Sequence, residues 1–127
     1  MQSRFEWQTG DLNSAVESAL KGVGIDEALI AASPTNVGAS NTLAVLYSQL
    51  GVYHGELGLK DKLDKKVAQM KAAKEANEKS LSIYRDLQSK GKLQGADANR
   101  LDELEREIVK GDAALIILQK NKLTERR

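Results

Sequence analysis

Apolar side chains recur every three or four residues along most of the chain, the spacing that gathers them on one face of an α-helix. We expect a short leading helix within 2–8 and long helices at about 12–32, 37–57, 61–90 and 99–119. Strict alternation of apolar and polar residues, which is typical of a half-buried strand, is scarce. The pattern therefore predicts an all-α fold of about five helices, the last of which caps the array.

The residues that bound these segments suit helix ends. A side-chain oxygen before a helix can accept a hydrogen bond from its first N–H groups. Residues placed to do so are Asp11, Thr35 or Asn36, Asp61 and Asn99. Pro34 cannot continue a helix, and Gly91 is typical of a helix C-terminus. Residues 120–127 are polar, so we expect that tail to fray.

Four of the segments carry apolar stripes, which predict their buried faces. In 12–32 the stripe is Ala15, Val16, Ala19, Val23, Ile25, Leu29 and Ile30. In 37–57 the stripe is Leu43, Leu46, Tyr47, Leu50, Tyr53 and Leu57. In 61–90 it is Leu63, Val67, Met70, Ala73, Asn77, Ser80, Leu81, Tyr84 and Leu87. In 99–119 it is Leu101, Leu104, Ile108, Leu115 and Leu118.

Composition narrows the chemistry that the chain can perform. Its 127 residues suit one domain, and they include no Cys and a single His, His54. Disulfides, thiolate chemistry and sites built on several cysteines or histidines are therefore excluded, and we expect no catalytic residues, no metal and no cofactor. A net charge of +1 gives no general attraction to nucleic acid. No apolar run approaches a membrane span and no signal peptide is evident, so we expect a cytoplasmic protein.

The chain also resembles itself. When the sequence is shifted by 58 residues, the helix expected at 12–32 aligns with the one expected at 61–90, with Ala15 on Ala73 and Leu29 on Leu87. Such self-similarity indicates a repeat of helical hairpins.

The motif Tyr47-x-x-Leu50-Gly51-x-x-His54 resembles the first helix of a tetratricopeptide repeat, with His54 where that family usually has Tyr. The resemblance implies a superhelix of antiparallel helical hairpins, with a partial repeat at 1–34, an elongated one at 35–90 and a loop, capping helix and tail at 91–127. The positions that it assigns to packing between helices are Ala15, Ala19, Tyr47, Leu50, Gly51, Ala73 and Ser80.

Two further stretches, 25–36 and 87–98, are similar to repeats found in bacterial proteins beside a serine/threonine kinase domain. This similarity implies that the chain is a piece of a larger bacterial protein, in which any catalysis lies elsewhere.

In such arrays the first helix of each hairpin lines a concave surface that binds a peptide or helix. The resemblance therefore implies a non-catalytic protein-interaction module or scaffold. The residues that it places on the concave side are Arg4, Gln8, Ser48, Gln49, Val52 and Glu56.

Two other functions stay open, and self-association is a further expectation. His54 could accept a phosphoryl group in a helical phosphotransfer module, or the chain could be a structural spacer beside a kinase domain. We also expect contact with a second copy through apolar side chains that one helix face cannot bury. These are Phe5, Trp7, Leu115, Ile116, Ile117 and Leu118.

Overall fold

A computed structural model describes residues 9–93 and 95–125. Within them lie four α-helices: α1 (Thr9–Ala32), α2 (Val37–Lys60), α3 (Leu63–Ser89) and α4 (Ala98–Glu125). A short 3-10 helix, Gly95–Asp97, precedes α4, and these described ranges contain no strand. The all-α prediction is confirmed, and the four expected long helices are present among the described residues. The expected leading helix, within 2–8, lies outside them.

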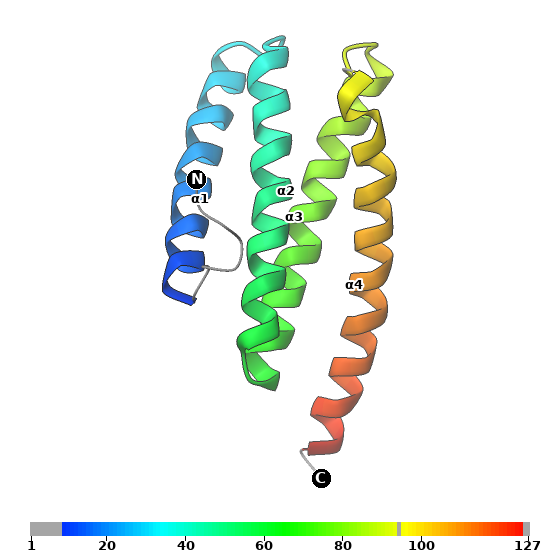
Figure 1. Ribbon diagram of the computed structural model, residues 1–127. Helices are drawn as coiled ribbons and strands as arrows, with labels where there is room; N and C mark the ends of the chain where they lie inside the picture. The colour runs from blue at the N-terminus through cyan, green and yellow to red at the C-terminus, as the bar shows by residue number, and fades with distance from the viewer. Residues whose placement is uncertain (1–8, 94, 126–127) are drawn as a thin grey trace.

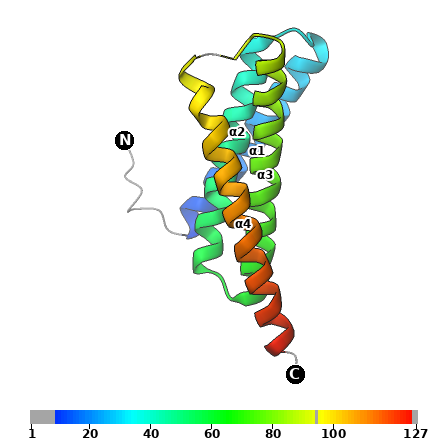
Figure 2. The ribbon, with the colours of Figure 1, turned by 90° about the vertical axis from the view of Figure 1, so that its right-hand side faces the viewer.

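The helices follow one another in antiparallel order. α1 packs on α2, α2 on α3 and α3 on α4, as Figure 1 shows. The view turned by 90° in Figure 2 shows α4 running past the turn between α2 and α3 at its C-terminal end. α3 therefore has a long helix on two sides, whereas α1 and α4 stand at the two ends of the series.

The start of α2 behaves as its sequence predicts. The backbone of Asn36 is extended, and its side-chain oxygen accepts a hydrogen bond of 3.0 Å from the N–H of Ala39. This bond satisfies one of the N–H groups that a helix start leaves without a partner. The prediction of Asn36 as a cap is confirmed.

The other three predicted caps are wrong. α1 already begins at Thr9, so Asp11 lies in its first turn, where a carboxylate favours the helix dipole. Asp61 closes α2, and Lys62 precedes α3 without a capping bond from its side chain. Asn99 lies inside α4. In each case the helix begins one or two residues away from the polar side chain, the scale on which helix ends are hard to place from sequence.

The end of α3 depends on Gly91. Its φ of +68° lies in the left-handed region, which glycine adopts without steric cost. The N–H of Lys92 then donates to the carbonyl of Leu87 at 2.8 Å, and the N–H of Gly91 to that of Gln88 at 3.0 Å. These two bonds close the helix, as predicted. By contrast, α4 continues as helix to Glu125, so the prediction that residues 120–127 form a frayed tail is wrong for 120–125.

The core consists of two clusters of buried side chains, one on each side of α2. The cluster shared by α2, α3 and α4 is Ala44, Leu81, Tyr84, Leu87, Leu101 and Leu104. The cluster shared by α1, α2 and α3 is Ala19, Val23, Leu43, Leu50 and Ala76. Ile83 packs against both clusters, which places α3 at the centre of the molecule.

Small residues bring α2 and α3 close together. A Cβ at Gly51 would overlap the side chain of Asn77, and one at Gly58 would lie 3.1 Å from Met70 Sδ. Nearby, the buried hydroxyl of Ser80 donates a 2.7 Å hydrogen bond to the carbonyl of Ala44. The close approach explains why two glycines are tolerated inside α2, although each lowers helix propensity by about 1 kcal/mol.

The predicted stripes of α3 and α4 face the core, but that of α1 does so only in part. Val23 is buried and Ile30 is half-buried, whereas Ile25 and Leu29 are 62% and 47% exposed. Asp26 is buried instead. The prediction for Ile25 and Leu29 is wrong because α2, the described helix on which α1 mainly packs, lies on the other side of α1.

Candidate interaction groove

A groove runs between α2 and α4, with α3 beneath it. It encloses about 590 Å³. Its lining residues are Ser48, Gly51, Val52, Asn77, Arg100, Glu103, Leu104, Arg106, Glu107 and Lys110. Because α3 packs against both α2 and α4, these two helices form the walls of the groove, and α3 forms its floor.

The α2 wall is uncharged. Ser48 and Val52 lie one turn apart, and Val52 keeps 41% of its surface exposed. Gly51 stands between them and admits the side chain of Asn77 from α3. This part of the groove therefore offers one apolar side chain beside a hydroxyl and an amide.

The α4 wall is charged along its whole length. Arg100, Glu103, Glu107 and Lys110 follow one another at steps of three and four residues, which aligns them on one helix face. Arg100 Nε lies 3.2 Å from Asp97 Oδ1, and Lys110 Nζ lies 3.8 Å from Glu107 Oε1. All four side chains are exposed, so they can exchange these contacts for contacts with a bound partner.

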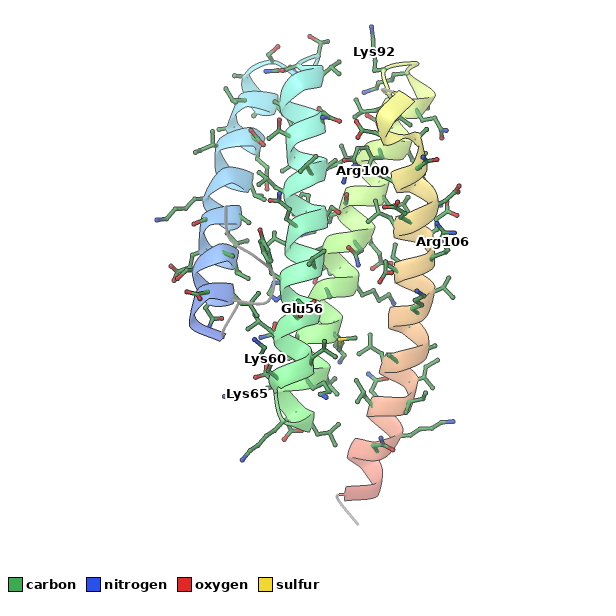
Figure 3. All side chains as sticks on the ribbon, viewed as in Figure 1. Glu56, Lys60, Lys65, Lys92, Arg100 and Arg106 are labelled. Carbon is green, nitrogen blue, oxygen red and sulfur yellow. The ribbon has the colours of Figure 1, made fainter. Side chains whose placement is uncertain are left out.

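Figure 3 shows Arg100 on the side of α4 that faces α2, with Arg106 farther round the same helix. From Arg100 to Lys110 the four side chains read positive, negative, negative, positive, so the groove selects no single sign of charge.

Tyr84 anchors α4 beside the groove. It is fully buried in the cluster shared by α2, α3 and α4. Burial raises the pKa of Tyr84, an effect that Arg100 opposes and Asp97 reinforces. The hydroxyl is therefore neutral at physiological pH, and it has no hydrogen-bond partner among the described residues.

Of the six side chains predicted to contact a partner, Ser48 and Val52 line the groove. Gln49 and Glu56 are exposed on α2 but do not belong to the lining, and Figure 3 labels Glu56 on that helix. Arg4 and Gln8 lie outside the described residues.

Sequence reasoning missed the α4 wall. The charged residues of this segment suggest an ordinary solvated helix face, which is how most such rows behave. One signal was available: Arg100, Glu103, Glu107 and Lys110 share a stripe that runs beside the buried stripe of Leu101 and Leu104. The missing information was that α2 stands opposite this stripe.

The positions that the resemblance assigns to helix packing are buried or half-buried. Buried are Ala19, Leu50, Gly51, Ala73 and Ser80, and half-buried are Ala15 and Tyr47. Tyr47 connects three helices: its hydroxyl donates to Glu27 Oε1 of α1 at 3.1 Å, and Lys79 Nζ of α3 lies 5.4 Å from its ring centre. Burial, followed by the contact with Glu27, raises the pKa of Tyr47.

His54 packs between α2 and α3. Its Nδ1 lies 2.7 Å from Gln69 Oε1, and the side chain is half-buried. With the amide oxygen as acceptor, Nδ1 donates this hydrogen bond, which ties His54 to α3.

The part of the chain that the structure describes contains no group of three or more Asp, Glu or His side chains placed to hold a metal ion. Over the same residues, no helix combines the length and apolarity that a membrane span needs.

The fold and the groove together define an all-α protein of serially packed antiparallel helices with a charged channel along one face. Comparison with protein-family models, curated proteins and solved structures finds no match to this chain.

Proposed function

We propose that this chain is a non-catalytic interaction module that binds a helix or extended peptide of another protein in the groove between α2 and α4. The observation that carries the proposal is the groove itself, which brings an exposed valine and a row of charges of both signs together from separate helices. Its lining residues span about three turns of α4, from Arg100 to Lys110, an extent that suits a short segment of chain.

The two walls suggest how the partner is held. Val52 offers the apolar contact that supplies binding free energy when water is excluded, and the charged side chains of α4 fix register and orientation. A complementary partner carries an apolar residue flanked by both acidic and basic side chains, spaced to oppose Glu103, Glu107 and Lys110.

The tetratricopeptide-like arrangement is part of this proposal. It is supported by the serial antiparallel packing and by the close approach of Gly51 to the neighbouring helix. On this interpretation α2 is the first helix of the hairpin at 35–90, and the capping helix α4 stands where the first helix of a further hairpin would line the concave surface. A cytoplasmic location and a place beside a kinase domain in a larger bacterial protein belong to the same interpretation.

Peptide display on the whole chain tests the proposal. The affinity of the selected peptides is then measured for the wild type, for Val52→Asp and for the double variant Glu103→Lys, Glu107→Lys. We expect each variant to weaken binding by at least about tenfold. Gln49→Asp and Glu56→Lys are the matched controls, because these residues are exposed on the same helix outside the groove.

Binding that resists both groove variants but is lost in the controls would move the site to another face of α2. Failure to select any peptide that depends on Val52 would overturn the proposal. All five substituted positions are exposed, so circular dichroism is expected to show an unchanged fold.

A further inference from the structure

The outer face of α4 carries exposed apolar side chains that no described helix covers. Val109, Ile116 and Ile117 are 67%, 56% and 60% exposed, and Ala113 between them is exposed as well. Val109, Ala113 and Ile116 are four and three residues apart, so they lie in one line along the helix. We call this line, with Glu105 before it and Lys120 after it, the α4 outer stripe.

The α4 outer stripe is separate from the groove. Leu101, Leu104 and Leu115 mark the face of α4 that packs on the core, and Glu103 and Lys110 mark the face toward the groove. At 100° per residue, Val109 and Ile116 fall roughly a third of a turn from both faces. Figure 1 shows α4 at the edge of the molecule, with no described helix beyond it.

We propose that the α4 outer stripe binds the same stripe of a second copy of this chain, with the two α4 helices antiparallel about a two-fold axis. The stripe is complementary to itself in that arrangement. When Val109 faces Ile116 of the partner, the two-fold axis also places Ile116 against the partner's Val109 and Glu105 against the partner's Lys120. Two apolar contacts are then flanked at both ends by opposite charges.

The remaining geometry accommodates the arrangement. Glu105 Oε1 accepts from Arg85 at 2.9 Å, which leaves its second oxygen for another donor. α4 extends beyond the turn between α2 and α3, so its C-terminal part is accessible to a partner helix (Figure 2). The inference does not depend on the proposed function, because it uses a different face of α4.

The outer face of α1 is the other candidate partner, since Ile25 and Leu29 are exposed there. Its apolar residues occupy only the C-terminal half of the helix, and exposed Ser14 and Ser18 occupy the other half. If Ile25 of an antiparallel α1 faced Val109, Ser18 would stand against Ile116, so α4 itself is the better match.

Light scattering and sedimentation of the whole chain over a wide range of concentration test the inference. We expect a dimer that Val109→Asp and Ile116→Asp each weaken at least about tenfold. Ile25→Asp, at an equally exposed position of α1, is expected to leave the dimer intact. A wild-type chain that stays monomeric, or a dimer lost only in Ile25→Asp, would overturn the proposal.

Because the chain contains no cysteine, introduced thiols report the direction of the helices. Val109→Cys mixed with Ile116→Cys is expected to form a disulfide between copies under mild oxidation, whereas each variant alone forms little. Efficient crosslinking of Val109→Cys to itself would mean parallel helices and contradict the proposal. Glu105→Lys and Lys120→Glu are each expected to weaken the dimer, and the double variant to restore it, which a purely structural role would not produce.

Discussion

α1 and α3 are similar in sequence but differ in how much of their surface is covered. The 58-residue shift aligns Ile25 with Ile83 and Leu29 with Leu87. Leu87 is buried and Ile83 packs against both core clusters, whereas Ile25 and Leu29 are largely exposed. The difference follows from the neighbours, since among the described helices α3 packs extensively on both α2 and α4, whereas α1 does so on α2 alone. An apolar stripe therefore shows which face can be buried, and the position in the array decides whether it is.

The face of α1 that does pack resembles its counterpart in α3. Asp26 aligns with Tyr84, and both are buried with one oxygen lacking a hydrogen-bond partner in the described structure. Gly22 aligns with Ser80, and both meet α2, at Leu46 and Ala44 respectively. The two helices are thus comparable position by position, which allows matched substitutions.

The largest difference is expected at the aligned leucines. Leu87→Ala removes a buried side chain from the core and is expected to lower the free energy of unfolding by about 2–5 kcal/mol. Leu29→Ala removes a side chain that is half in water, so the loss is expected to stay within about 0.5 kcal/mol. Urea denaturation of the two variants measures both values. Equal losses would mean that the outer face of α1 is covered in solution.

The second comparison concerns the two buried oxygens without partners. A buried polar group that makes no hydrogen bond costs about 1–3 kcal/mol. Asp26→Leu, which is similar in size and apolar, is therefore expected to raise the free energy of unfolding by about 1 kcal/mol or more. Tyr84→Phe removes only a hydroxyl and is expected to raise it by less.

Thermal melts at neutral pH compare these two variants with the wild type. Asp26→Asn is the control, because it keeps a polar group and should gain little. Destabilisation by Asp26→Leu would mean that the carboxylate has a partner in solution, for example an ordered water molecule.

The sequence predicted the helices well, because their apolar spacing and the signals at Pro34, Asn36 and Gly91 are local. It predicted the faces of α3 and α4, whose stripes extend over most of each helix. It failed for Ile25, Leu29 and Asp26, where burial depends on a neighbouring helix that is distant in sequence. No local rule specifies the side on which that neighbour lies.

The groove could be predicted only in part, for the same reason. Ser48 and Val52 follow from the resemblance of α2 to a known repeat, which specifies the face of that helix. Arg100, Glu103, Glu107 and Lys110 have no such motif, and their alignment opposite α2 arises from the packing of α4 on α3. Sites assembled between helices therefore require the arrangement of those helices, which periodicity does not supply.

The smallest effects are expected where the aligned small residues meet α2. Ser80→Ala removes a buried hydrogen bond to the Ala44 carbonyl and is expected to cost about 1 kcal/mol. Gly22→Ala places a Cβ 2.9 Å from Leu46 Cδ1, the end of a flexible side chain that can move aside. The gain in helix propensity of about 1 kcal/mol should then offset that shift and leave stability almost unchanged.

Gly24→Ala is the control, because no atom lies within 4 Å of its added Cβ and it therefore measures the gain in helix propensity alone. Chemical denaturation of the three variants then isolates the packing cost at Gly22. If Gly22→Ala were as destabilising as Ser80→Ala, α1 would pack against α2 as tightly as α3 does, and the contrast between the two helices would be confined to the outer face of α1.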